Sequence, residues 1–371
     1  YIMHTRNFKN DANLLNSAKS FKKKNEKFLS KAIYILKINT IKFFARLICF
    51  KNNYLFYNSY INNKFKLLKI ILELGDIPFM HSFSFFNNKI AKEEIDISLR
   101  KKIKLNIESK NSDIKILKFL LMELLPTIYL EGFQIQKKLA DNSHLPKKIK
   151  KVFVSHAYPD NSFKFWLADK INSGTKLVHG QHGAGYNIYK DFFATFHELG
   201  ISDFFFTWGW KNNNKKIVPV GNYLINKKKK AKLSYGKKIL LVLPAATIFK
   251  RTGEIFYADS LTEDAIEYQK FLDNIDSNLL DNINIRNHPA VKRRDLDFIN
   301  FVTFDKKKIK NQNSNISFDK SIINHGLVIF NYLSTEFFKL MSLDVPCILL
   351  LNKNIFNHCV DDKAKEDFYK L

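Results

Sequence analysis

Residues 175–210, TKLVHGQHGAGYNIYKDFFATFHELGISDFFFTWGW, carry the pattern that decides the fold. An apolar strand, TKLV, runs into a loop with three glycines (Gly180, Gly183 and Gly185), and a helical pattern over 191–199 leads to a second strand, DFFFTWGW. Near-continuous apolar strands joined by a helix are typical of a parallel sheet covered on both faces. The stretch therefore predicts an α/β fold with polar loops at the strand ends.

The same alternation extends in both directions. Upstream, KVFVSHAY (151–158) predicts a strand, and a helical pattern follows it until Gly174. Downstream come the strand IVPVGN (217–222), a lysine-rich break at 222–238 and a second series of elements. That series predicts, in order, the strand KILLVLPAA, a helix over 261–272, the strands NINIRNHP, NISF and GLVIFN, the helix STEFFKLMSL and the strand VPCILLL.

The lysine-rich break separates two Rossmann-like halves, and a basic region precedes both. We expect a mostly helical N-terminal region at 1–140, a first Rossmann-like domain at 141–225, a linker at 226–238 and a second, incomplete Rossmann-like domain at 239–371. Apolar residues recur at helical spacing among lysines over 12–50. This segment either packs on its own domain or lies on an anionic membrane surface. A further helix over 114–125 should end at Pro126.

Charge and cysteine usage bound the class of protein. The 371 residues include 61 Lys and Arg against 35 Asp and Glu, a net charge of +26. Such an excess attracts nucleic acid, an anionic membrane or a phosphate-bearing substrate, but a composition biased towards Lys, Asn, Ile and Phe explains it equally well. The three cysteines form no CxxC, which argues against a disulfide framework or structural zinc and fits a reducing cytoplasm. The first residue is Tyr1 rather than Met, as expected of a fragment.

Polar residues follow four of the predicted strands. His156 comes after KVFV, HGQHGAG after TKLV, RNHP (286–289) after INI, and the pair Ser334-Thr335 after LVIFN. In an open α/β sheet, ligands bind outside the carboxyl ends of the strands. We therefore expect these four loops to line one cleft between the two domains.

His182, inside the glycine loop, is the candidate general base, because an imidazole titrates near neutral pH. The glycines would let the backbone approach a ligand closely; the alternative is a tight turn with a structural histidine. Metal binding by His179, His182 and His197 is a further alternative. We do not expect it, because a strand-borne His179 should point away from the loop and no acidic cluster accompanies the three.

The second half offers groups for an anion. Arg286 can fork onto a phosphate and His288 can donate to one, unless Asn-His-Pro is only a turn. Ser334 or Thr335 caps a helix whose free N–H groups bind anions such as a diphosphate, although capping alone explains the pair. Glu336 accepts from sugar or ribose hydroxyls, or merely favours the helix dipole.

The alternate aromatic residues of DFFFTWGW share one face, which predicts that they point into the core. They are Phe204, Phe206, Trp208 and Trp210. Stacking of a sugar on one of the two tryptophans, at the end of the strand, is the alternative.

Taken together, HGQHGAGY, the pair His197-Glu198 and SDFFFTWGW (202–210) resemble the transferases encoded in O-antigen gene clusters, over residues 150–350. More distantly, the order of motifs resembles the GT-B transferases that build capsules and teichoic acids, including capsular Kdo transferases and CDP-glycerol glycerophosphotransferases. The matching motifs are the HG loop, VPVGN at the domain exit, LPAAT with Arg251, RNHP and FNYLSTEFF.

This resemblance implies a GT-B-like fold, two Rossmann-like domains with a cleft between them, and assigns roles to the candidate residues. It places His182 and Glu198 as catalytic residues in the acceptor-side domain. It places Arg286, His288, Ser334 and Thr335 on the donor's phosphates, Glu336 near the donor sugar or ribose, and the backbone of Gly180, Gly183 and Gly185 against the ligand. Two departures matter: Asn331 stands where the glycerophosphotransferases commonly have aspartate, and the chain stops at Leu371, before the terminal helices expected of a GT-B fold.

We therefore expect a metal-independent glycosyltransferase that moves a sugar from a nucleotide-activated donor, used as substrate without a further cofactor, to an O-antigen or capsule acceptor. The acceptor would be lipid-linked or an oligosaccharide, and the enzyme cytoplasmic or peripheral on the inner face of the cell membrane. A sugar-nucleotide epimerase on the same scaffold and a non-enzymatic RNA- or membrane-binding protein remain open. No interleaving of aromatic residues with Gly and Arg or Lys is present, so we expect no nucleic acid partner.

Overall fold

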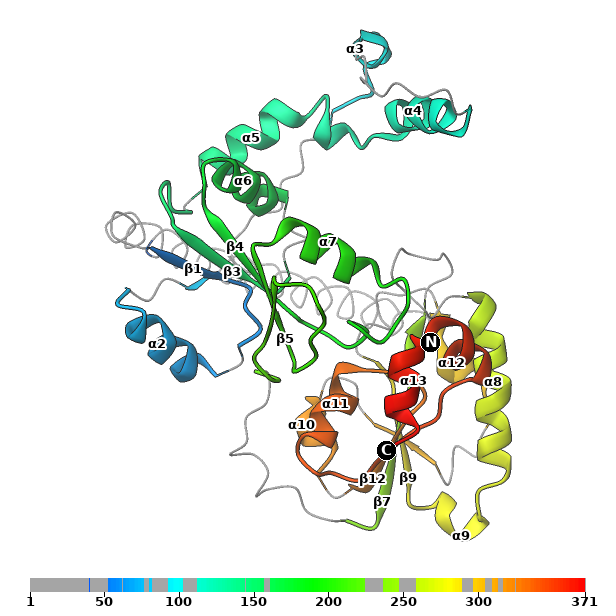
Figure 1. The fold of residues 1–371 in the computed structure, drawn as a ribbon. Helices are drawn as coiled ribbons and strands as arrows, with labels where there is room; N and C mark the ends of the chain where they lie inside the picture. The colour runs from blue at the N-terminus through cyan, green and yellow to red at the C-terminus, as the bar shows by residue number, and fades with distance from the viewer. Residues whose placement is uncertain are drawn as a thin grey trace, which may run out of the picture. The chain divides into compact units, whose positions relative to one another are not determined.

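The structure is a computed structural model in which the chain forms two parallel β-sheets flanked by helices (Figure 1). The described residues are Thr40, 53–61, 63–76, 80–81, 93–102, 112–143, 145–156, 161–223, 236–246, 258–288, 296–303, 309–312, 316–323 and 325–370. The amphipathic pattern at 12–50 (Thr40 apart), most of the expected linker and Arg251 lie outside them. None of the described helices is long and apolar enough to cross a membrane.

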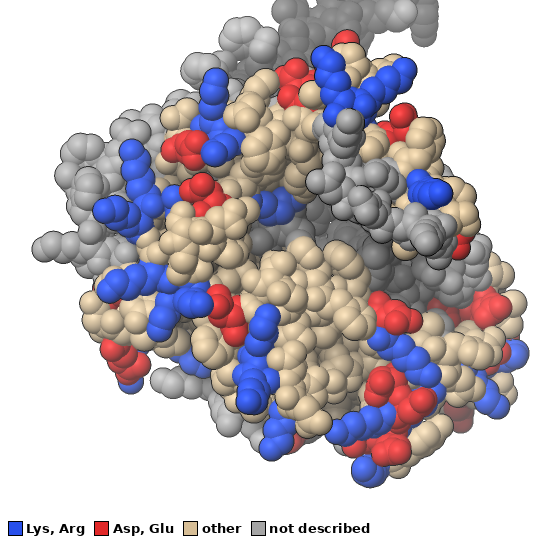
Figure 2. Space-filling view, turned by 45° about the horizontal axis from the view of Figure 1, so that its top comes forward, with Lys and Arg blue, Asp and Glu red and all other residues tan. Residues whose placement is uncertain are grey.

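The chain divides into two compact units. One contains 1–58, 68–152 and 157–176, and the other contains 59–67, 153–156 and 177–371. On the face shown in Figure 2, Lys and Arg side chains are interspersed with Asp and Glu.

The first sheet has six strands in the order β2-β1-β3-β4-β5-β6. Their bounds are β1 Tyr54–Tyr57, β2 Met80–His81, β3 Lys151–Val154, β4 Lys176–Gly180, β5 Phe204–Thr207 and β6 Ile217–Pro219. Strands β4, β5 and β6 pair in parallel. The predicted α/β character of this half is confirmed. The sequence pattern did not predict β1, because a four-residue run, YLFY, is too short to show a period within a region expected to be helical.

Helices connect these strands and precede them in the chain. They are α2 Lys64–Glu73, α3 Ile97–Lys102, α4 Ser112–Leu124, the 3₁₀ turn η2 Thr127–Tyr129, α5 Phe133–Asp141, α6 Asn161–Asn172 and α7 Phe193–Ile201. Helix α4 ends before Pro126, as predicted. Buried Arg100 donates to the carbonyl oxygens of Met122, Glu123 and Leu125 at the end of α4 and forks onto Glu131. The guanidinium thereby satisfies carbonyls that the helix leaves without a partner.

The second sheet has five parallel strands in the order β11-β9-β7-β12-β13. Their bounds are β7 Lys238–Val242, β9 Ile283–Arg286, β11 Lys310–Asn311, β12 His325–Phe330 and β13 Cys347–Leu349. The helices of this half are α8 Ala258–Asp273, α9 Ser277–Leu280, α10 Phe318–Ser321, α11 Thr335–Met341, α12 Lys353–Cys359 and α13 Asp362–Phe368, with η5 at Phe298–Phe301. A small antiparallel pair joins β8 Ala245–Ala246 to β10 Leu296–Asp297.

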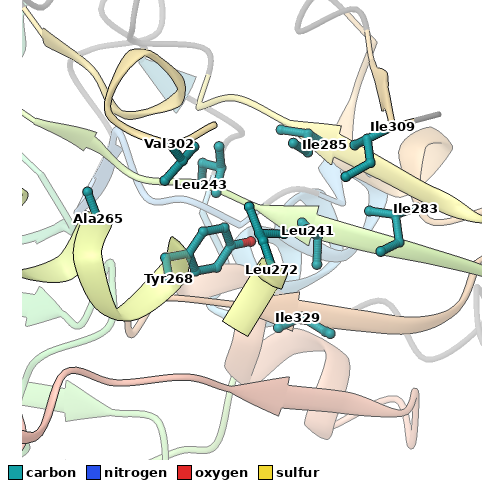
Figure 3. Packing of buried hydrophobic residues seen from close by; sticks show 10 residues of the cluster. All are labelled: Leu241, Leu243, Ala265, Tyr268, Leu272, Ile283, Ile285, Val302, Ile309 and Ile329. Carbon is teal, nitrogen blue, oxygen red and sulfur yellow. The ribbon is translucent and has the colours of Figure 1, made fainter. Parts of the chain in front are cut away.

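Successive residues of β7 face opposite sides of the second sheet, as in any strand. Leu241 and Leu243 lie in a buried cluster with Ala265, Tyr268 and Leu272 of α8 (Figure 3). Leu240 and Val242 of β7 belong to a second cluster with Phe337 and Leu340 of α11. Because both faces are covered by helices, the near-continuous apolar strands of this half are explained, and the predicted Rossmann-like sheet is confirmed.

Two predictions about strands are wrong in detail. NISF is not a strand, because Phe318 begins helix α10 and the carbonyl of Ile316 accepts a hydrogen bond from Arg286 instead of a neighbouring strand. In β5 the buried residues are Phe205 and Thr207, whereas Phe204 is 47% exposed. An uninterrupted FFF run gives no phase, so packing on the α7 side, and not the sequence, selects the buried face.

Candidate functional site

The glycine loop follows β4 and is shaped by close contacts. A Cβ on Gly180 would lie 2.6 Å from the Tyr223 hydroxyl and 2.7 Å from Phe153, closer than any side chain tolerates. Gly185 has a φ of +100°, a conformation that other residues rarely adopt. Gly180 is therefore required by the close packing of neighbouring side chains, and Gly185 by its backbone conformation.

Gln181 joins the two most distinctive motifs of the sequence. This side chain, 4% exposed, donates through Nε2 to the carbonyl of Gly183 at 3.0 Å. Its Oε1 accepts from the backbone N–H of Trp208 at 3.0 Å and from the indole N–H of Trp210 at 2.8 Å. The segment after β5 thus holds the glycine loop in its conformation. These hydrogen bonds explain why the QHG and TWGW motifs occur together in this sequence.

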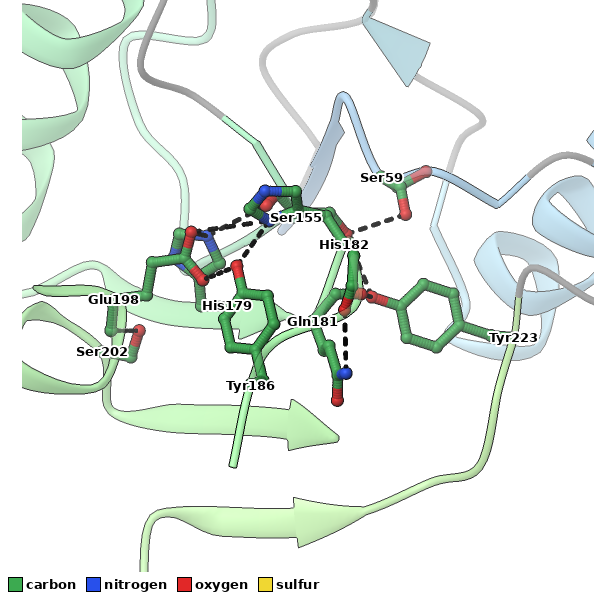
Figure 4. A network of polar contacts seen from close by, with 10 residues as sticks. Ser59, Ser155, His179, Gln181, His182, Tyr186, Glu198, Ser202 and Tyr223 are labelled. Carbon is green, nitrogen blue, oxygen red and sulfur yellow. Dashed lines mark hydrogen bonds and ion pairs between the residues drawn. The ribbon is translucent and has the colours of Figure 1, made fainter. Parts of the chain in front are cut away.

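His182, Tyr186 and Glu198 form a connected polar chain beneath this loop (Figure 4). The Tyr186 hydroxyl donates to Oε2 of Glu198 at 2.7 Å and lies 2.7 Å from Nδ1 of His182. A hydroxyl has one proton. Because that proton goes to the carboxylate, the tautomer that fits the network has His182 donate from Nδ1 to the tyrosine oxygen and carry its lone pair on Nε2. The His182 ring also has a hydrogen bond with the backbone of Ser155.

His179 converges on the same carboxylate, contrary to the expectation that it points away. Its Nε2 lies 3.2 Å from the carbonyl of Ser155 and 3.4 Å from Oε1 of Glu198, because α7 packs over the face of β4 that buries His179. His197 is exposed on α7 and stacks on Phe193. Within the described part of the chain, no group of three or more His, Cys, Asp or Glu side chains could hold a metal ion.

Burial dominates the electrostatics of His182. The side chain is 19% exposed, and desolvation lowers its pKa to about 4, an effect that Glu198 opposes and His156 reinforces. Burial also lowers the pKa of His156, whose ring centroid lies 4.7 Å from that of His182. At neutral pH both imidazoles are therefore uncharged, and Nε2 of His182 is able to accept a proton.

The start of α11 lies next to the glycine loop. Ser334 is the N-cap, and its Oγ accepts from the N–H of Phe337 at 3.1 Å, so the capping prediction is confirmed. A Cβ on Gly183 would lie 3.6 Å from Oγ1 of Thr335. The structure thus brings together two motifs that are about 150 residues apart in the chain.

Arg286 forms hydrogen bonds within the protein. It is buried and donates to Oγ of Ser321 and to the carbonyl of Ile316. His288 is half-buried just beyond β9, and Glu336 makes an ion pair with the lysine three residues on. A guanidinium has five N–H donors, and the two hydrogen bonds of Arg286 named here use two of them. A contact of Arg286 with phosphate therefore stays a prediction.

Sequence analysis missed Gln181 and Tyr186, and it set His179 aside. The signal for Tyr186 is its position at the end of HGQHGAGY, four residues after His182. For His179 and Gln181 there was no local signal, because these partners lie 19 to 29 residues away in the sequence.

Comparison with known families identifies the chain. The profile of the LIC12162 family transferase matches residues 2–371. The chain belongs to this family of transferases. A comparison with curated proteins gave no match. Among solved structures, the chain is similar to a glycosyltransferase from Rickettsia africae ESF-5, with 14% identity over 75% of this chain and 73% of the other. The TM-score is 0.30, so this likeness supports no inference about function.

Proposed function

We propose that this transferase is a glycosyltransferase of GT-B type that moves a sugar from a nucleotide-activated donor to a hydroxyl of an O-antigen or capsule acceptor. The observation that carries the proposal is the buried chain from His182 through Tyr186 to Glu198. It leaves a neutral imidazole nitrogen at the end of a parallel strand, where ligands of α/β sheets bind. A base in this position would accelerate transfer to a hydroxyl by taking its proton.

In the proposed reaction the acceptor hydroxyl oxygen bonds to the anomeric carbon of the donor sugar. The bond from that carbon to the donor phosphate breaks, the nucleotide leaves with the electron pair, and the hydroxyl proton passes to Nε2 of His182. Tyr186 and Glu198 hold the required tautomer through Nδ1. The Glu198 carboxylate, 3.5 Å from Nδ1, stabilises the imidazolium that forms.

The donor phosphates would bind at the start of α11 and at the end of β9. Thr335 supports this placement, since it lies beside the glycine loop, and Ser334, Arg286, His288 and Glu336 are the further candidates. Protein N–H groups and the guanidinium would stabilise the leaving phosphate without a metal ion. We further propose a lipid-linked or oligosaccharide acceptor, reached from the cytoplasm at the inner face of the membrane.

The test begins with a thermal-shift panel of UDP-, GDP-, CMP- and CDP-linked sugars, because a ligand that binds the native state raises the melting temperature. The sugar nucleotide that binds is then the donor in a nucleotide-release assay with a mixture of bacterial lipid-linked glycans. We expect Tyr186→Phe to lower the rate by about 10²-fold, in the range of general base catalysis, and His182→Ala to lower it further.

His197→Ala is the matched control, because this histidine of the same segment is exposed on α7 and stacks on Phe193. Its rate should equal that of the wild type. Normal rates in His182→Ala would refute the base assignment. Conversion of the donor to another sugar nucleotide without any acceptor would instead establish the epimerase alternative.

A further inference from the structure

Three rings gather where β3 and β4 end and where the chain leaves β1. They belong to Tyr60, His156 and His182, and we call them the ring cluster. The ring centroid of His182 lies 4.7 Å from that of His156 and 5.9 Å from that of Tyr60. The Tyr60 and His156 centroids are 6.2 Å apart at an interplanar angle of 79°. All three rings are therefore in mutual contact around the candidate base.

Tyr60 is held in place by a strained piece of backbone. Its φ is +55°, and that of Asn58 is +45°, values that are unusual for bulky residues. The hydroxyl of Ser155 donates to the carbonyl of Ser59 at 2.9 Å, which ties this turn to the end of β3. The ring is nevertheless 38% exposed. Strain that positions an exposed aromatic ring is typical of ligand sites and has no value for a core.

The charge around the ring cluster limits what it can bind. Burial lowers the pKa of both imidazoles, so neither is protonated at neutral pH. The side chain 3.5 Å from Nδ1 of His182 is the carboxyl of Glu198 and not a cation. An anionic group placed here would lose its hydration and gain no opposite charge from His156, His182 or Glu198. A neutral ring with hydroxyl groups would keep its hydrogen bonds.

We propose that the ring cluster is the acceptor subsite and that it takes an uncharged sugar ring, in contrast to a phosphorylated acceptor. Tyr60 would lie against the apolar C–H face of the sugar, His156 would bond to one of its hydroxyls, and the reacting hydroxyl would point at Nε2 of His182. The proposal rests on the proposed function for the identity of the reaction, but the binding that it describes requires no donor.

The experiment observes the histidine ring C–H signals of the full chain by NMR during titration with methyl glycosides of glucose, galactose and mannose. We expect the signals of His156 and His182 to shift with at least one glycoside. The exposed His197, stacked on Phe193, is an internal control whose signal should stay unchanged. A parallel titration with glycerol 3-phosphate should shift neither site histidine. Shifts by the phosphate alone, or by none of the compounds, would overturn the proposal.

Variants separate binding from folding. Tyr60→Gly removes the ring, and it should fold because glycine accepts a positive φ best. It should weaken glycoside binding about tenfold, whereas Tyr60→Phe should bind normally. His156→Phe keeps a ring against His182 but loses the hydrogen bond, so we expect about fivefold weaker binding. If Tyr60→Gly only lowered the melting temperature and left the titration unchanged, the ring would be structural.

The two proposals fail separately. Glycoside binding without any sugar-nucleotide turnover would contradict the proposed function and leave a sugar-binding site. Sugar-nucleotide turnover by a wild-type protein in which no neutral glycoside shifts the signals of His156 and His182 would contradict the acceptor subsite alone.

Discussion

Glu198→Gln should leave the protein as stable as the wild type, or make it more stable, while slowing transfer. Glu198 is 0% exposed, and the contacts of its carboxyl include the Tyr186 hydroxyl and two imidazoles. Burying a carboxylate costs several kcal/mol, and neutral donors offset this only in part. An amide of the same shape still accepts from Tyr186, so we expect the free energy of unfolding to change by less than about 2 kcal/mol.

The rate should respond in the opposite direction. An imidazolium 3.5 Å from the carboxylate is stabilised by ~5 kcal/mol at an effective dielectric constant of ~20. If the proton is about half transferred in the transition state, the carboxylate stabilises that state by roughly half of this energy, ~2 kcal/mol. Loss of the charge in Glu198→Gln should therefore lower kcat roughly 30-fold. Under the proposed mechanism, proton transfer to His182 is thus the step that Glu198→Gln would slow.

Urea unfolding and kcat are measured on the same preparations. Glu267→Gln is the matched control, since this carboxylate is exposed on α8 and pairs only with Lys270 among the contacts seen. It should change stability by less than about 0.5 kcal/mol and leave kcat unchanged. A Glu198→Gln protein that unfolds readily but keeps normal kcat would refute the reasoning, because the carboxylate would then serve the fold.

Three further predictions concern stability. Gln181→Ala removes three hydrogen bonds from a buried side chain and should lower the free energy of unfolding by ~3 kcal/mol in a urea series. Gln269→Ala is the control: it also removes three hydrogen bonds, but from a side chain nearer to solvent, and should lower the free energy of unfolding by less than ~1 kcal/mol. Arg100→Ala strands the buried Glu131 and the last carbonyls of α4 and should destabilise its unit by ~3–5 kcal/mol in calorimetry; no change would mean that water replaces the guanidinium. The pKa of His182 falls from 6.5 to about 4 on folding, so between these pH values the unfolded chain binds one proton that the folded chain does not. The free energy of unfolding should therefore be ~3 kcal/mol higher above pH 6.5 than near pH 4, and it should fall as the pH falls through this window. His182→Gln should flatten the stability–pH curve there.

The sequence was informative where structure follows from neighbours in the chain. Apolar runs ending in polar loops located the central strands of both sheets, and Ser334 before an amphipathic run predicted its own cap. Gly174 was expected to end α6, and its φ of +93° shows why glycine is there. Each of these is a local property of backbone and side chain.

The parts that failed depend on contacts between distant elements. Periodicity could not tell that α7 would place Glu198 over the buried side of β4, so His179 was assigned a direction without knowledge of its partner. Phe204 and Phe205 are chemically identical, and only the packing against α7 distinguishes them. Tyr60 lies about 120 residues before His182, in a segment where no pattern marks a ligand site.

A base of such low pKa would suit the proposed reaction for a physical reason. With a pKa of about 4, His182 is a weak base in the unliganded protein. A donor phosphate bound near Thr335, beside the same glycine loop, would bring negative charge close to the imidazole and raise that pKa towards neutrality. The base would then become strong only after the donor has bound. Water reaching the ring cluster in the absence of donor would find neither an electrophile nor a basic histidine, so the proposed mechanism predicts that the donor binds before the proton is transferred.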